Sequence, residues 1–230
     1  MRYVFPPAPT PSIPVSGTDS AFPVRRIWCV GRNYGEHTRE MGGDPANDTP
    51  IFFAKPADAV TLDRTLPFPL HTTDLHHEIE LAVAIGGQGV HVPAGKALDL
   101  VYGYALALDM TRRDLQAIAK KKGQPWDLAK GFDQSCPITP IRPVTEIGHP
   151  TQGRISLSVN GEIRQNGEIR DLIWPIPEII ATLSNFVELR PGDLILTGTP
   201  SGVGPVLAGD RLVGECDGVG RLEVAYATRD

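Results

Sequence analysis

The chain has 230 residues, of which 41% are hydrophobic and 21% are charged, and its formal net charge is −5. These values are ordinary for a soluble globular protein and allow one large core, and they argue against nucleic acid as a partner. No apolar stretch approaches the length of about 20 residues that spans a bilayer, so no membrane association is expected. The only basic triplet, Lys120–Lys122, is expected to be the solvated end of a helix.

Residues 1–24 contain many prolines and are expected to form an extended segment in front of a main domain at residues 25–230. The three cysteines, Cys29, Cys136 and Cys216, are far apart and odd in number. This pattern predicts buried thiols in a reducing compartment, which we take to be the cytoplasm. Frequent turns, indicated by 24 glycines and 22 prolines, favour a β-rich fold.

The first functional candidates follow an expected strand at residues 26–31. Asn33 and Glu36 have the spacing of a capping box, which predicts a short helix over residues 34–41. That helix would place His37 and Glu40 on one face, where a carboxylate can orient an imidazole that acts as a general base. Such pairs are also common on exposed helices. The loop at residues 42–50 is glycine- and proline-rich, so this helix could serve as a lid.

The central pattern lies at residues 76–86, where large apolar residues alternate strictly with glutamates and alanines. This alternation predicts a strand. Glu78 and Glu80 then share one face with Ala82 and Ala84, while the opposite apolar face belongs against the core. Two neighbouring carboxylates repel each other unless a cation lies between them. The small alanines are expected to leave space on that face for a bound group. His77 should point away from Glu78 and be packed.

Several further polar residues stand at the ends of apolar segments. Lys55 ends a strand at residues 51–55 and could bind a ligand or simply extend towards solvent. Asp109 ends the strand at residues 102–109 and could be a ligand or a helix cap. A helix is expected at residues 111–122, with Arg113 and Gln116 on one face, and Lys130 follows in a mixed apolar setting.

Most of the second half of the chain is expected to contribute strands and a helix to the core. Asn160-Gly161 predicts a type I′ hairpin within residues 155–165. Residues 175–189 have the apolar spacing of an amphipathic helix. The glycine-rich loop at residues 197–205 lacks a dinucleotide fingerprint, but it could bring backbone N–H groups close to a ligand.

The carboxylates Glu78, Glu80 and Asp109 together form an all-oxygen ligand set. Hard oxygen ligands suit Mg²⁺, Mn²⁺ or Ca²⁺ rather than zinc. Three protein ligands would leave coordination positions open for water or substrate, as a catalytic metal requires.

Six short motifs in this order resemble the fumarylacetoacetate hydrolase family, from about Val24 to the C-terminus. They are Gly31-Arg-Asn-Tyr34 with His37 and Glu40, Lys55-Pro56, His77-Glu-Ile-Glu80, Leu108-Asp-Met-Thr-x-Arg-Asp-x-Gln116, Ala129-Lys130 and Gly198-Thr-Pro-x-Gly-Val203. Within the family the chain looks most like the short bacterial enzymes that hydrolyse fumarylpyruvate in gentisate breakdown.

The resemblance implies a β-rich α+β fold, a mixed β-sandwich or roll with short helices, and a homodimer. It implies that Glu78, Glu80 and Asp109 bind Mg²⁺ or Mn²⁺. It also implies that His37 and Glu40 form the catalytic dyad, with Lys130 as the active-site lysine. The positions near the substrate's carboxylate and oxo groups are Arg113, Gln116 and Thr199.

The implied reaction is hydrolysis of an acylpyruvate, a 2,4-dioxo acid, to pyruvate and a second acid. His37, oriented by Glu40, would deprotonate water, and Lys130 would help to hold the departing enolate. A fumaryl group needs a further cation for its distal carboxylate, for which Arg32 and Arg39 are candidates. Two alternatives stay open: an oxaloacetate decarboxylase or dioxo-acid isomerase/decarboxylase of the same family, and a non-catalytic protein that binds metal and oxo acids.

Overall fold

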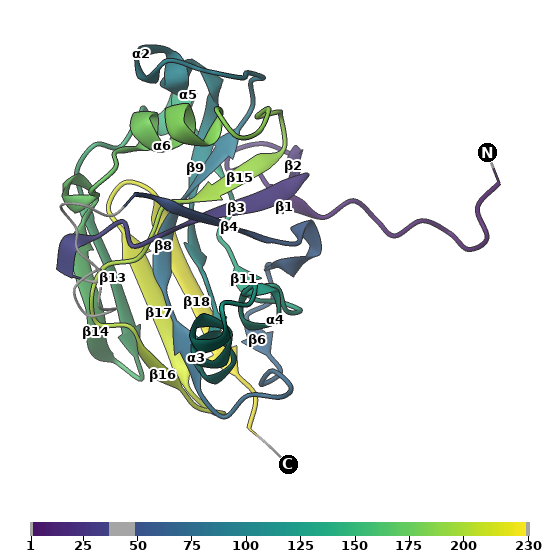
Figure 1. The fold of residues 1–230 in the computed structure, drawn as a ribbon, viewed down its shortest axis with the longest axis vertical. Helices are drawn as coiled ribbons and strands as arrows, with labels where there is room; N and C mark the ends of the chain where they lie inside the picture. Colours follow the sequence, from purple (N-terminus) through teal and green to yellow (C-terminus); the bar gives the residue numbers. More distant parts are fainter. Residues whose placement is uncertain (1, 37–48, 229–230) are drawn as a thin grey trace.

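The computed structural model describes residues 2–36 and 49–228, and two sheets form its body (Figure 1). The first has six strands in the order β12-β9-β8-β15-β3-β4, and the second has five in the order β14-β13-β17-β18-β6. The six-stranded sheet is mixed, because β15 runs parallel to β3 and antiparallel to β8. Its strands are β3 (Arg26–Gly31), β4 (Ile51–Lys55), β8 (Ile79–Ile85), β9 (Val101–Leu108), β12 (Arg142–Pro143) and β15 (Asp193–Leu196).

The remaining strands are short or belong to the second sheet. The five-stranded sheet contains β6 (Thr65–Leu66), β13 (Arg154–Val159), β14 (Glu162–Glu168), β17 (Arg211–Cys216) and β18 (Gly220–Tyr226). Three small sheets contain β1 (Ser12–Pro14) with β2 (Ala21–Pro23), β5 (Val60–Thr61) with β11 (Cys136–Pro137), and β7 (Leu75–His77) with β10 (Thr111–Arg112) and β16 (Gly204–Val206). The expected β-rich α+β fold is confirmed.

The helices are short and lie at the two ends of the sheets (Figure 1). They are α2 (Ala94–Ala97), α3 (Arg113–Lys122), α4 (Asp127–Lys130), α5 (Val144–Ile147) and α6 (Ile176–Leu183), with 3-10 turns η1 (Ala57–Ala59), η2 (Leu98–Leu100) and η3 (Ile169–Asp171). Gly123 ends α3 in the left-handed conformation (φ 64°), as expected for a helix stop. The helix predicted over residues 175–189 ends earlier, at Leu183, where the Ser184 hydroxyl donates to the Ala181 carbonyl. None of the described helices has the length and apolarity that crossing a membrane demands.

Both faces of β8 are buried, and this corrects one expectation. Ile79, Leu81, Val83 and Ile85 pack into the apolar cluster that lies between the sheets. Ala82 and Ala84 were expected to face open space, but each is only 1% exposed. They belong instead to a second apolar cluster, which also contains Ile13 and Phe22 of the β1–β2 hairpin. The alanines are small because another apolar layer lies on them.

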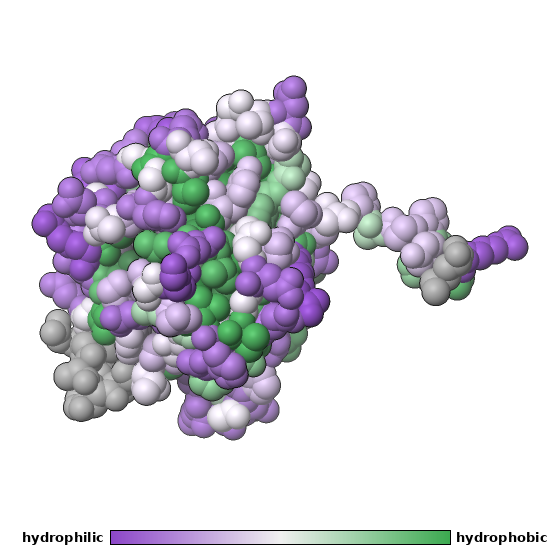
Figure 2. Space-filling view, turned by 90° about the horizontal axis from the view of Figure 1, so that it is seen from above, coloured by the Kyte–Doolittle hydropathy of each residue, from purple (hydrophilic) through white to green (hydrophobic). Residues whose placement is uncertain are grey.

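The proline-rich N-terminus therefore has two parts. Residues 2–10 have no regular structure, are exposed and stand clear of the body in both views (Figures 1 and 2). Residues 12–24 form the hairpin that contributes Ile13 and Phe22 to the core. The expected boundary at residue 24 stays a prediction. Cys29, Cys136 and Cys216 are all free and buried.

Candidate metal centre

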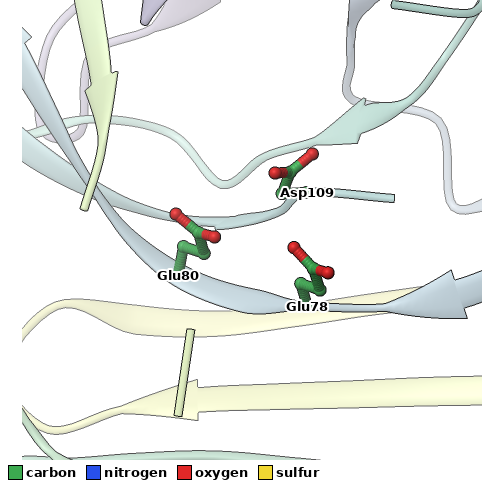
Figure 3. A group of neighbouring side chains, drawn as sticks. All are labelled: Glu78, Glu80 and Asp109. Atoms are coloured by element: carbon green, nitrogen blue, oxygen red, sulfur yellow. The ribbon is translucent and has the colours of Figure 1, made fainter. Parts of the chain in front are cut away.

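Three buried carboxylates meet where β8 begins and β9 ends (Figure 3). Ile79 pairs with Leu108 in the antiparallel ladder, so Glu78, just before β8, lies beside Asp109, just after β9. The Asp109 N–H donates to the Glu78 carbonyl at 2.8 Å. Each of Glu78, Glu80 and Asp109 offers an oxygen within 4.8 Å of the others, and none is more than 5% exposed. The prediction that the two glutamates point to one place is confirmed.

Buried cations neutralise two of these three carboxylates. Lys130 Nζ lies 2.7 Å from Glu78 Oε2 and 2.7 Å from Asp109 Oδ2. Lys55 Nζ lies 2.8 Å from Asp109 Oδ1, and Arg113 donates to Glu78 Oε1. Burial alone would lower the pKa of Lys130, but Asp109 and Glu78 outweigh it and raise the pKa well above its ordinary value. Lys130 is therefore a permanent cation in this arrangement and not a base.

Glu80 has no such cation among the described residues. The hydrogen bond to its carboxylate comes from the Gly198 N–H, at 2.7 Å from Oε2. Burial raises the pKa of Glu80 well above its ordinary value, and the charges of Asp109 and Glu78 raise it further. A divalent cation held by the three carboxylates would place a positive charge directly beside Glu80, and their oxygen donors suit Mg²⁺ or Mn²⁺, with Ca²⁺ also compatible. The residues present thus fit a metal.

The Gly198 backbone explains how that N–H reaches Glu80. Gly198 has φ 102°, and a Cβ at this position would lie 2.7 Å from the Asn33 Cβ. Only glycine combines this backbone with so close an approach. The glycine-rich loop thus brings an N–H group to Glu80, whereas its approach to a ligand stays a prediction.

A cavity surrounds the open side of the carboxylates. Its lining includes Arg32, Arg113, Gln116, Lys130 and Thr199, which were all predicted as site residues. Arg113 also donates to Gln116 Oε1 at 2.6 Å, so these two side chains are held together on α3. Arg32 has a left-handed backbone (φ 62°), an uncommon conformation for a residue other than glycine. The cavity is thus acidic at its base and basic along its walls.

Lys55 was predicted to bind substrate, and this stays a prediction. Its side chain is buried behind Asp109 and donates to the backbone carbonyls of Met110 and Lys130. Among the described residues it is not part of the cavity lining. In this structure Lys55 therefore contacts the carboxylate of Asp109 from behind.

Lys120 and Trp126 are cavity residues that the sequence did not reveal. Lys120 is exposed in the last turn of α3, as expected, but it also lines the cavity, where its Nζ lies 5.3 Å from the centre of the Trp126 ring. Partial burial lowers the pKa of Lys120 to about 8, and the nearby positive Arg113 and Arg32 add to this effect. Its spacing along α3, one turn beyond Gln116 on the same face, was the available clue.

Asn33 is not a helix cap of the kind predicted. Its amide oxygen accepts from the Trp174 N–H at 2.7 Å, and its Nδ2 donates to the Thr197 and Trp174 carbonyls. Asn33 thus joins the end of β3 to the loop that carries Thr199. The predicted catalytic pair His37 and Glu40, and the candidate Arg39, lie outside the described residues.

Comparisons with known proteins agree with this arrangement. Residues 26–225 match the family described as fumarylacetoacetate (FAA) hydrolase C-terminal. The crystal structure of fumarylpyruvate hydrolase from Pseudomonas aeruginosa, in complex with Mn²⁺ and pyruvate, is 48% identical with a TM-score of 0.96, and the match covers 99% of this chain and 100% of that one.

Two relatives act on a different oxo acid. The mitochondrial oxaloacetate tautomerase FAHD1 of Mus musculus is 44% identical over 208 residues, which is 87% of this chain and 94% of that protein. The mitochondrial oxaloacetate decarboxylase of Dictyostelium discoideum is 45% identical over 187 residues, covering 80% and 85%.

Proposed function

The chain belongs to the fumarylacetoacetate hydrolase family, and within it we propose that this protein is a metal-dependent hydrolase of acylpyruvates. The expected reaction cleaves the C–C bond of fumarylpyruvate to give fumarate and pyruvate, a step in aromatic catabolism such as gentisate breakdown. The observation that carries the proposal is the buried carboxylate cluster, in which Glu80 has no cation of its own among the described residues, beside a wall of basic side chains. Similarity to the fumarylpyruvate hydrolase structure supports the choice of substrate.

The carboxylates of Glu78, Glu80 and Asp109 would hold Mg²⁺ or Mn²⁺. When bound, the metal would act as a Lewis acid that polarises the oxygens of an oxo acid. Lys130, a buried cation 2.7 Å from two of these carboxylates, is placed to stabilise negative charge that develops on the departing enolate. His37, oriented by Glu40, keeps its role as the predicted general base.

The outer cavity supports a substrate with two carboxylates. Arg113 and Gln116 lie next to the metal ligands, whereas Arg32 and Lys120 are the further cations of the lining. A distal carboxylate of a fumaryl group would be attracted by Arg32 and Lys120, and it would offset their mutual repulsion. A neutral acyl group would gain nothing from them.

A second candidate function is favoured by the tautomerase and decarboxylase relatives. Oxaloacetate is also a dianionic 2-oxo acid, and its reactions likewise pass through an enolate that Lys130 could stabilise. The two functions differ in whether water must attack a 4-carbonyl group. The homodimer and the cytoplasmic location stay predictions.

The test is a substrate panel with the purified protein in Mn²⁺ or Mg²⁺. Fumarylpyruvate, acetylpyruvate and oxaloacetate would be followed by loss of enol absorbance and, separately, by pyruvate formation coupled to lactate dehydrogenase. We expect pyruvate from the acylpyruvates, fastest from fumarylpyruvate. Enol loss from oxaloacetate without pyruvate would instead identify a tautomerase, and pyruvate from oxaloacetate alone a decarboxylase. No turnover of any substrate, with tight metal binding, would indicate a binding protein.

A further inference from the structure

Gln165 on β14 is a fully buried amide whose polar atoms all have partners. Its Oε1 accepts from the Ile79 N–H at 3.1 Å and lies 2.9 Å from His77 Nδ1. Its Nε2 donates to Thr199 Oγ1 at 2.7 Å and to the Pro200 carbonyl at 2.8 Å. One side chain therefore joins the two residues that flank the metal ligand Glu78 to the loop that lines the cavity.

These partners leave only one orientation for the amide. A backbone N–H can only donate, so the atom facing Ile79 must be the oxygen. A backbone carbonyl can only accept, so the atom facing Pro200 must be the NH₂ group. His77 must then donate from Nδ1, and the Thr199 hydroxyl must accept from Gln165.

This fixes what Thr199 can do in the cavity. Its oxygen accepts from Gln165, so its own O–H hydrogen is not donated to that amide, and no described protein group takes that hydrogen. Thr199 is only 2% exposed and lines the cavity with the three carboxylates. The hydroxyl is therefore set as a donor towards whatever anionic or carbonyl oxygen enters.

A β-bulge explains how a polar side chain on an outer strand reaches this place. Leu157 pairs with Gln165, but the next residue, Ser158, pairs with Ile163, so Arg164 is the extra residue of the bulge. Ile163 is 59% exposed and Gln165 is fully buried, although residues two apart in a regular strand share a face. Bulges often redirect side chains in this way near functional sites.

The loop that carries Thr199 is fitted closely to this bulge. Gly202 has φ 89°, and a Cβ there would lie 2.0 Å from the Arg164 carbonyl oxygen. Any larger residue would push the loop away from β14 and lengthen the bond between Gln165 and Thr199. The bulge, the glycine and the amide thus form one connected arrangement.

We propose that Gln165 is a positioning residue that makes the Thr199 hydroxyl a hydrogen-bond donor to a carboxylate or oxo oxygen of the bound ligand. That the ligand is an oxo acid rests on the proposed function. Gln165 itself does not line the cavity among the described residues, so it acts through Thr199.

The test measures binding of oxalate, a small unreactive dianion, to the Mn²⁺-loaded protein by calorimetry. Gln165→Met keeps the side-chain length and removes all four hydrogen bonds, and Thr199→Val removes the hydroxyl. Each should weaken oxalate binding about 10- to 100-fold, as expected for a lost hydrogen bond to a charged group. The double variant should be no weaker than Thr199→Val, because Gln165 acts through that hydroxyl. Gln152→Met, at an exposed position, is the matched control and should bind as the wild type does.

Two results would overturn the inference: Thr199→Val binding oxalate as tightly as the wild type, or losses that add in the double variant. The result for Thr199→Val is decisive even if Gln165→Met does not fold. Thermal unfolding would show whether Gln165→Met is folded. Thr199→Ser, which keeps a hydroxyl, should bind oxalate and stay sensitive to Gln165→Met. Because oxalate binding needs no turnover, the inference can hold even if no acylpyruvate is hydrolysed, so its failure is distinct from failure of the proposed function.

Discussion

Replacing Glu80 by glutamine should stabilise the metal-free protein and weaken metal binding at the same time. Glutamine has nearly the same shape but no charge, so it resembles the protonated form of Glu80. In the metal-free protein this carboxyl is 2% exposed and lies within 4.8 Å of oxygens of Glu78 and Asp109. Its pKa is raised above the value in the unfolded chain by burial and by those two charges.

The sign and size of the effect follow from this shift. The folded state holds the Glu80 proton more tightly than the unfolded state, so stability is full below about pH 4.5 and falls as the pH rises towards the raised pKa. The loss is at most ~1.4 kcal/mol per pH unit, over the range in which only the unfolded chain has released this proton. For a domain of this size each such pH unit corresponds to at most about 3–6 °C in Tm. Glu80→Gln has no proton to lose there and should avoid this fall.

The assay is thermal unfolding between pH 5 and pH 8, with EDTA and with excess Mn²⁺. A ligand at 1,000 times its Kd stabilises the wild type by ~4.1 kcal/mol. Glu80→Gln should lose most of this gain in stability. Replacing a residue that only hydrogen-bonds to a metal ligand lowers metal affinity roughly 10- to 100-fold, and replacing a ligand itself should lower it further. Glu178→Gln, at an exposed position on α6, is the control and should change neither curve. Equal stabilisation of wild type and Glu80→Gln by Mn²⁺ would refute the assignment of Glu80 as a ligand.

Two further predictions test the cavity wall and the alanine face. Lys120→Met should raise KM for fumarylpyruvate roughly 2- to 5-fold but leave KM for acetylpyruvate unchanged. In the wild type, KM for fumarylpyruvate should rise above about pH 8, where Lys120 loses its proton. The same rise of KM with pH in the Lys120→Met variant would contradict a role of Lys120 in substrate binding. Ala82→Val should cost about 1–3 kcal/mol in urea unfolding through overpacking, with KM unchanged. A changed KM at unchanged stability would restore the idea that the alanine face is open.

Much of the candidate metal centre could be predicted from the sequence because its three carboxylates depend on local patterns. Alternation alone put Glu78 and Glu80 on one face, and Asp109 stood out as the polar end of an apolar strand. The structure then shows that the ends of β8 and β9 meet. The hairpin at Asn160-Gly161 was equally local, and both residues have the positive φ of a type I′ turn.

The features that were missed depend on partners distant in the chain. Asn33 has the local pattern of a helix cap, yet its partners are Trp174 and Thr197. Gln165 follows two residues after Ile163, so a regular strand would place both side chains on one face. Only the bulge, which the alternation of residue types does not reveal, buries one and exposes the other. Lys120 lies in a run of three lysines that is typical of a helix surface, and only the packing of α3 against α4 shows that it lines the cavity.

The register between β8 and β9 links the core to the metal centre. A slip of one residue would exchange the faces of the strand, moving Glu80 into the apolar cluster between the sheets and Leu81 out of it. Burying an unpaired carboxylate among apolar side chains costs several kcal/mol, so core packing excludes the slipped register. The Ile79 N–H, held by Gln165, secures the same register from the second sheet. The close approach of three carboxylates is therefore a consequence of apolar packing on the opposite face of β8, and the cations Lys130, Lys55 and Arg113 offset the repulsion that this approach creates.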